Sequence, residues 1–295
     1  MKYIGKIFLC ALSSVIGTLV GGMFSSALHL EQPKLPGPMN MPLLVVLCLG
    51  AGLVLSLALA ALSPWLPGKH WPRFAVVAWF VFAWLGINNT IEASIFTTMG
   101  GGPAVIVTLL VPSLSVAGAV VLLFGNRKHG KSFSDNLRRF FADRTVRQWA
   151  LRFSLAVLAF PVVYFFFGMP VGLLVGKFYQ NQSFGLQMPS LGVVIGVQFV
   201  RSLVALLAAL PLLVVWPGSR QRFAWIFGLN LFVVAGLYGL IQAYWMPWTL
   251  RSIHTVELLL DSVVYGWLVA ALLLPHATAH NPVPVEETGV RNHTI

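Results

Sequence analysis

The stretch PLLVVLCLGAGLVLSLALAALSP, residues 42–64, contains no charged side chain and decides the fold class of this protein. A run of about twenty apolar residues is long enough for an α-helix to cross the hydrocarbon core of a bilayer. A helix also satisfies its own backbone hydrogen bonds, which the bilayer interior cannot do for it. The stretch therefore predicts a membrane-spanning helix.

Seven further stretches have the same apolar character, so the sequence predicts an all-α polytopic membrane protein with eight transmembrane helices. Charged residues make up 9% of the chain, whereas a soluble domain contains about a quarter, and no polar stretch is long enough for a separate soluble domain. The first stretch follows Lys2 and Lys6 as in a signal peptide, but it is long enough to span and is expected to be retained. The eight spans are expected at residues 5–28, 42–64, 74–97, 103–125, 149–175, 190–216, 223–246 and 252–274.

The basic residues indicate how these spans are oriented. If the N-terminus is cytoplasmic, the external connections contain only Lys34, Lys177 and Arg251 as basic residues. Cytoplasmic loops have an excess of Lys and Arg, so both termini are predicted to be cytoplasmic. The basic residues of the cytoplasmic segments are then Lys2, Lys6, Lys69, Arg73, Arg127, Lys128, Lys131, Arg138, Arg139, Arg144, Arg147, Arg220 and Arg222.

This orientation also accounts for the formal net charge of +11, which in a soluble protein would suggest nucleic acid. The expected partners are the lipid bilayer and anionic lipids at the cytoplasmic face, with no nucleic acid. The location expected is a plasma membrane, of the bacterial inner-membrane type. Cys10 and Cys48 lie in different spans, which argues against a disulfide or a CxxC metal site. No Walker A, GxGxxG or GxSxG motif is present, and neither a cofactor nor a catalytic residue is predicted.

The two halves of the chain resemble each other. Pro67-Gly68 aligns with Pro217-Gly218, and LGINNTIEA, residues 85–93, aligns with AGLYGLIQA, residues 235–243. We therefore expect two parallel four-helix repeats, residues 1–126 and residues 149–275, related by an axis along the membrane normal. Transporters built from such repeats place their sites at the interface between the halves.

Two segments are expected outside the repeats. Residues 127–148 form a basic cytoplasmic linker, and apolar side chains between its basic residues favour an amphipathic helix over 132–149, capped by Ser132 with Asp135, on the cytoplasmic leaflet. A solvated linker is the alternative. Residues 276–295 are polar with two prolines and are expected to be a disordered cytoplasmic tail.

Small residues recur every four positions in two spans, which permits close helix packing. They are Ser13, Gly17, Gly21 and Ser25 in the first span, and Gly168, Gly172 and Gly176 in the fifth. Packing within one chain is preferred over dimerisation as the explanation, and a homodimer stays open.

Polar side chains inside the spans are costly and mark the candidate site. A helical rise of about 1.5 Å per residue places Arg201 and Asp261 at similar depths near the midplane. Asp261 is therefore the predicted partner of Arg201, with Glu257 as the alternative. The charged groups all fall between the midplane and the external face, as a cavity open to the outside would require. The binding or proton-relay candidates are Arg201, Glu257, Asp261, Glu92, His254, Asn88, Gln198 and Gln242.

Three functions are compatible with this cluster. Buried pairs could merely tie the helices of a structural or accessory membrane protein together, although Glu92 and Glu257 then lack a second intramembrane cation and one or both must carry a proton. A small-solute or proton-coupled transporter would use a carboxylate as proton carrier and Arg201 as an anchor for an anionic group. An intramembrane metal-dependent enzyme would use His254 and Glu257, with Glu92, as weak candidate ligands. The sequence favours the transporter over the enzyme and leaves the substrate unknown.

Overall fold

The computed structural model describes residues 2–38, 40–125 and 132–275. Within these ranges the protein is helical, and an isolated bridge between Thr97 and Leu186 is its one β-type pairing. In these residues eight helices are long and apolar enough to cross a membrane, which confirms the predicted all-helical class and the predicted number of apolar spans. They cover Tyr3–Ala27, Met41–Trp65, His70–Phe96, Gly102–Phe124, Val146–Gln180, Leu191–Val215, Arg220–Gln242 and Trp248–Leu273.

Six of these spans are built around one α-helix each, and two are interrupted. The uninterrupted helices are α1 (Tyr3–Ala27), α2 (Met41–Leu62, extended by a 3-10 turn to Trp65), α5 (Gly102–Phe124), α7 (Val146–Gln180), α8 (Leu191–Val215) and α11 (Trp248–Leu273). The third span consists of α3 (His70–Phe82) and α4 (Asn89–Phe96), joined by a π-helical segment, Ala83–Asn88. The seventh consists of α9 (Arg220–Phe232) and α10 (Tyr238–Gln242), joined by a π-helical segment, Val233–Leu237.

The two interruptions occur at matching points of the chain. Both α3 and α9 have 13 residues and lead directly into their π-helical segments. Gly86 and Gly236, which align in the sequence, lie inside these segments. π-Helical turns are rare and frequently occur at functional sites. Asn88 is the last residue of the first interruption, and Glu92 and Gln242 lie within one or two turns after an interruption, so the local geometry sets the direction in which these side chains point.

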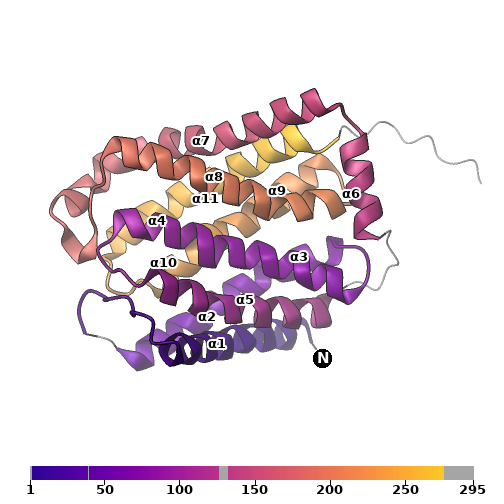
Figure 1. Cartoon of the computed structure of the whole chain (residues 1–295). Helices are drawn as coiled ribbons and strands as arrows, with labels where there is room; N and C mark the ends of the chain where they lie inside the picture. The colour runs from indigo at the N-terminus through magenta and orange to yellow at the C-terminus, as the bar shows by residue number, and fades with distance from the viewer. Residues whose placement is uncertain (1, 39, 126–131, 276–295) are drawn as a thin grey trace, which may run out of the picture.

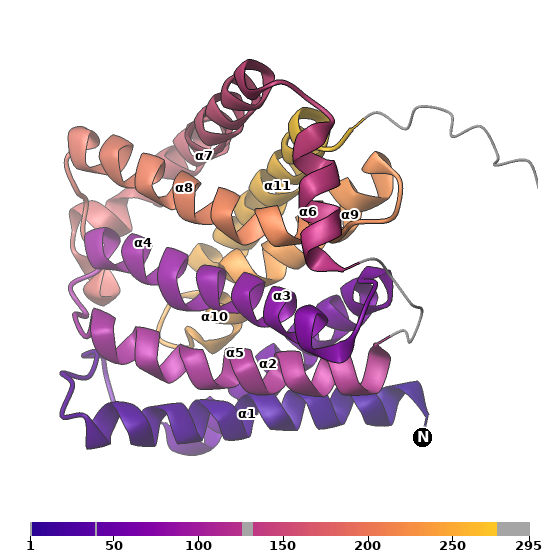
Figure 2. The ribbon, with the colours of Figure 1, turned by 45° about the vertical axis from the view of Figure 1, so that its right-hand side comes forward.

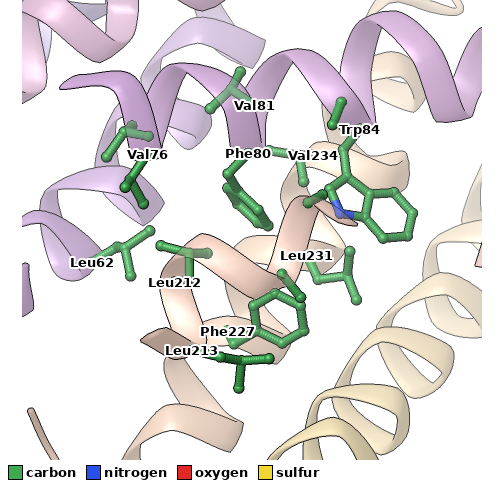
Figure 3. Packing of buried hydrophobic residues seen from close by; sticks show 14 of the residues in the cluster. Leu62, Val76, Phe80, Val81, Trp84, Leu212, Leu213, Phe227, Leu231 and Val234 are labelled. Carbon is green, nitrogen blue, oxygen red and sulfur yellow. The ribbon is translucent and has the colours of Figure 1, made fainter. Parts of the chain in front are cut away.

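The helices form one bundle in which the third span is central. In Figures 1 and 2, α1, α2 and α5 lie together on one side, α7, α8 and α11 lie on the other, and α3 and α4 run between α5 and α8. Figure 3 shows the apolar core where these groups meet, with Phe80 and Trp84 on one side and Leu212, Phe227 and Leu231 on the other. Trp84 and Phe227 are each 1% exposed, so this core is closed.

The small residues of the first span pack as predicted. A Cβ atom added at Gly17 or Gly21 would overlap with α5, at Ser115 and Thr108 respectively, so glycine lets the two backbones approach. The prediction is wrong for the fifth span at Gly172, because a Cβ there would meet nothing within 4 Å. The same holds for Gly176, and only Gly168 of that stripe faces a side chain of another helix.

The segment before α7 differs from its prediction as a single amphipathic helix. A short helix, α6 (Phe133–Ala142), begins at Ser132, whose side chain accepts a hydrogen bond from the backbone of Asp135 as expected. The helix ends at Ala142, and α7 starts afresh with a capping box in which Thr145 and Gln148 bond each other's backbone. The start of the linker, residues 127–131, and the predicted tail, residues 276–295, lie outside the described residues.

The two ends of the bundle differ in charge. At the end that α6 covers, hereafter the α6 end, Arg144, Arg152 and Arg220 donate hydrogen bonds to the last carbonyl groups of α11. Cations stabilise the C-terminus of a helix, where carbonyl groups are left unpaired. The opposite end, hereafter the distal end, holds residues 97–101 between α4 and α5 and the connection between α7 and α8.

Candidate functional site

A cavity of about 710 Å³ lies inside the bundle towards the distal end. Ligand pockets usually have volumes of about 300–1,000 Å³. The cavity wall includes residues 97–100 of the distal loop and continues inward along α4, α7 and α11. Its ionisable lining residues other than tyrosine are Glu92, Arg201, His254, Glu257 and Asp261, all of them candidates from the sequence.

Arg201 is the centre of a closed hydrogen-bonded cluster. Its two terminal nitrogens, Nη1 and Nη2, lie 2.6 and 2.9 Å from the two carboxylate oxygens of Glu92. Its Nε donates to Asn88 Oδ1 at 2.7 Å, and Nη1 also donates to Gln198 Oε1 at 3.1 Å. Asn88 in turn donates to the backbone carbonyl of Arg201 at 2.9 Å. Four of the five N–H groups of the guanidinium are therefore used, and its side chain is 4% exposed.

The predicted pairing of Arg201 with Asp261 or Glu257 is wrong, because its partner is Glu92. Arg201 belongs to α8, which packs against α4 and the preceding π-helical segment. Side chains lean towards the N-terminus of their own helix, and α4 and α8 run in opposite directions, so Arg201 and Glu92 lean towards each other. An estimate of depth from the helical rise compares Cα positions only. It takes no account of the direction of the side chains, and so it did not identify Glu92 as the partner of Arg201.

A second cluster joins α11 to α7. His254 Nδ1 lies 2.6 Å from Glu257 Oε2, as their spacing of three residues on one helix face predicts. The other ring nitrogen, Nε2, lies 3.0 Å from the hydroxyl of Tyr179. A Cβ atom at Gly168 would stand 3.2 Å from Glu257 Oε1, so glycine at this position leaves room for the buried carboxylate.

Asp261, one turn further along α11, has no such partner. Within the described ranges it forms no ion pair, and its buried Oδ1 atom has no hydrogen-bond partner. Glu257, Glu92 and Arg201 lie within electrostatic range of it, although none contacts it as an ion pair. The cavity therefore contains one carboxylate that the rest of the described protein leaves uncompensated.

Other polar atoms that line the cavity are also left without hydrogen-bond partners. Trp84 Nε1, Thr90 Oγ1 and Tyr265 Oη belong to buried residues that line the cavity, and none has a hydrogen-bond partner among the described residues. Buried polar groups in folded proteins are nearly always hydrogen-bonded, so each exception requires an explanation. Their position around the same cavity suits a space that takes up water or a polar solute.

The prediction placed Gln242 in the cluster, and the structure places it at the edge. Gln242 lines the cavity, but its Oε1 accepts a hydrogen bond from the thiol of Cys48 on α2, at 3.7 Å. α10, which carries Gln242, packs against α2 rather than against α8. Gln242 therefore joins neither the Arg201 cluster nor the His254 cluster.

The contribution of α7 to the cavity was not predicted from the sequence. Phe160, Tyr164 and Tyr179 all line the cavity, and Tyr179 completes the cluster at His254. The ring centroids of Phe160 and Tyr164 lie 5.5 and 5.9 Å from the guanidinium carbon of Arg201. The spacing of four residues between Phe160, Tyr164 and Gly168 puts them on one face, which is the signal that could have identified this wall.

The metal-site hypothesis lacks its third ligand. Among residues 2–38, 40–125 and 132–275, no three His, Cys, Asp or Glu side chains are grouped so that they could hold a metal ion. His254 and Glu257 bond each other, and Glu92 is engaged by Arg201. The donors that the hypothesis requires are therefore committed to other contacts.

Comparisons with known proteins add no further evidence. No protein-family model matches the chain, and neither a curated protein nor a solved structure shows significant similarity to it.

Proposed function

We propose that this protein is a small-solute transporter of a plasma membrane, of the bacterial inner-membrane type. The solute enters the cavity from the distal end, and Asp261 exchanges a proton as the solute binds and leaves. The observation that carries this proposal is an uncompensated carboxylate in a solute-sized cavity within a bundle of eight apolar helices. A purely structural protein has no need of that combination.

The distribution of basic residues supports the orientation of this transporter. The α6 end holds Arg138, Arg144 and Arg220, among many others, whereas the basic residues at the distal end are Lys34, Lys177 and Arg251. By the positive-inside rule, the α6 end is cytoplasmic and the distal end faces outward. Both termini are then cytoplasmic, and the cavity is reached from the outside.

The matching interruptions support a duplicated architecture. The π-helical segments Ala83–Asn88 and Val233–Leu237 interrupt the third and seventh spans after helices of equal length. We propose that residues 1–126 and 149–275 are two parallel four-helix repeats. Many transporters bind their solutes near the interface between repeats, beside interrupted helices. Residues of both interrupted spans line the cavity, which supports this proposal.

The chemistry of Asp261 supports coupling to protons. An ionised carboxylate in an apolar bundle is costly unless a cation or a set of hydrogen-bond donors compensates it. Asp261 has neither in the described protein, so whether it carries a proton depends on what occupies the cavity. Arg201 is not suited to the role of anion anchor, because Glu92, Asn88 and Gln198 occupy its donors.

A transporter opens its cavity first to one side of the membrane and then to the other. This alternating access can be tested without knowing the solute. Ala235 lines the cavity, so Ala235→Cys, in a chain whose Cys10 and Cys48 are replaced by alanine, reports access to it. A membrane-impermeant thiol reagent is applied to right-side-out and to inside-out vesicles. Transport predicts labelling from both sides, because the cavity opens in turn to each.

A matched control gives the labelling expected for a cysteine that does not line the cavity. Ala205 on α8 is fully buried in the apolar core and does not line the cavity, so Ala205→Cys should stay unlabelled from both sides. Labelling of Ala235→Cys from the outside alone would indicate a static binding pocket and contradict transport. The absence of labelling from either side would show that the cavity is closed and would refute the proposal altogether.

A further inference from the structure

We infer that the solute is an organic cation, such as a lipophilic amine or an onium ion, and that Asp261 is its counter-ion. This inference rests on the proposed role of the cavity as the solute site. The charges, the aromatic walls and the unpaired polar atoms of the cavity support it.

The charge of the cavity favours a cation. Its lining contains three carboxylates, at Glu92, Glu257 and Asp261, against one guanidinium and one imidazole. The guanidinium and Glu92 neutralise each other, and the imidazole can at most neutralise Glu257. Asp261 remains as an uncompensated negative charge whenever it is ionised, so an anionic solute would be repelled and a cation attracted.

The aromatic walls suit the same kind of solute. The ring of Tyr265, one turn after Asp261 on α11, packs edge-on against Phe160 at 5.2 Å, and Phe160 lies 6.0 Å from Trp84. The faces of such rings attract cations, most strongly where water is excluded. The aromatic residues that line the cavity are Trp84, Phe96, Phe160, Tyr164, Tyr179, Tyr238, Trp245 and Tyr265.

A bare metal ion fits this cavity poorly. Calcium needs six to eight oxygen ligands around one point, and magnesium needs an octahedral set. No three acidic or His side chains are so grouped in the described parts of the chain, and a volume of about 710 Å³ far exceeds one ion. A larger cation fills the space with apolar groups, places its charge beside Asp261 and offers any N–H group to the free oxygens of Thr90 and Tyr265.

Binding of the cation and binding of a proton at Asp261 exclude each other. When the protonated carboxyl meets the cation, its O–H bond breaks, the proton leaves to solvent, and the carboxylate pairs with the cation. One proton is released for each monovalent cation bound, so the charge of the cavity is unchanged. Across a membrane the same exchange is an antiport of one cation against one proton.

Equilibrium binding to the full-length protein in detergent tests this inference, with tetraphenylphosphonium as probe. Wild-type protein should bind the probe and release protons in weakly buffered solution. Asp261→Asn should weaken binding by about tenfold or more, which corresponds to about 1.4 kcal/mol, while Asp261→Glu should retain it. Tetraphenylborate has the same shape and the opposite charge, and it should not bind to the cavity.

A second carboxylate serves as control for net charge. Glu31 is exposed near the distal end, where it pairs loosely with Lys34, so Glu31→Gln should leave probe binding unchanged. Equal binding of tetraphenylphosphonium by wild type and Asp261→Asn, or equal binding of tetraphenylborate by wild type, would overturn the inference. Failure of wild type to bind the cation, together with labelling of Ala235→Cys from both sides, would overturn the inference and leave the transport proposal standing.

Discussion

Arg201 and Asp261 line the same cavity, yet their surroundings are opposite. Arg201 is held by three side chains through four of its N–H groups, and its carboxylate partner Glu92 is bonded through both oxygens. Asp261 forms no ion pair in the described protein, and one of its oxygens is buried without a partner. Charges in this apolar bundle therefore have two uses: one ties helices together, and the other is kept available for a ligand.

These uses predict different costs of substitution. Removing one partner of a buried pair leaves the other charge uncompensated, which costs about 3–5 kcal/mol. Removing a charge that has no partner leaves nothing behind to be compensated. The stability of variants therefore separates the two classes of residue, independently of any transport assay.

The largest effect is expected for Arg201→Met. It leaves Glu92 without its cation and removes the hydrogen bond that the Arg201 side chain donates to Asn88, so the free energy of unfolding in detergent should fall by about 3 kcal/mol or more. The double variant Arg201→Met with Glu92→Leu should recover part of the loss, because no lone charge remains. Unfolding temperatures in detergent measure both. If the single variant unfolds like wild type, Arg201 is not a structural tie.

A smaller effect is expected for Tyr179→Phe. This change removes the hydroxyl that lies 3.0 Å from His254 Nε2, and one such hydrogen bond contributes about 0.5–1.5 kcal/mol. Tyr164→Phe is the matched control, because the hydroxyl of Tyr164 has no hydrogen-bond partner among the described residues. Equal unfolding temperatures for the two variants would contradict the proposed tie between α7 and α11.

Gly168→Ala and Gly172→Ala should differ by about 1 kcal/mol in their free energies of unfolding, because only Gly168 contacts Glu257. Alanine is favoured over glycine inside a helix by about 0.5–1 kcal/mol, so Gly172→Ala, where a Cβ meets nothing within 4 Å, should stabilise the protein. Gly168→Ala should lose that gain, because its Cβ would press on Glu257 Oε1 at 3.2 Å. Equal stabilisation by both would show that Glu257 can move aside freely.

Much of the fold could be predicted because apolar length alone identifies a spanning helix. The eight spans follow from runs such as residues 42–64, whatever their neighbours are. The candidate site was predictable in composition, since Arg201, Glu92 and Asp261 are conspicuous in apolar stretches. The partner of Arg201 was not predictable, because it depends on which helix packs against α8 and on the direction in which each side chain leans.

The aromatic side of the cavity could not be predicted from the sequence for a related reason. Tyr164 and Tyr179 belong to a span that is apolar on every face, so the sequence does not say which face meets the cavity. The π-helical segment Ala83–Asn88 could not be predicted either, because its sequence, AWLGIN, contains no proline that would interrupt a helix. Tertiary contacts decide such features, and a single sequence contains no direct record of them.

The unfolding temperature of Asp261→Asn in detergent, with and without tetraphenylphosphonium, tests most directly the claim that Asp261 is kept free for a cation. Without the probe, Asp261→Asn should unfold at the temperature of wild type, in contrast to Arg201→Met. A ligand that binds only the folded protein raises its stability, so the probe should raise the unfolding temperature of wild type and raise that of Asp261→Asn by much less. An equal rise in both proteins, or a loss of stability in Asp261→Asn as large as that in Arg201→Met, would contradict the claim.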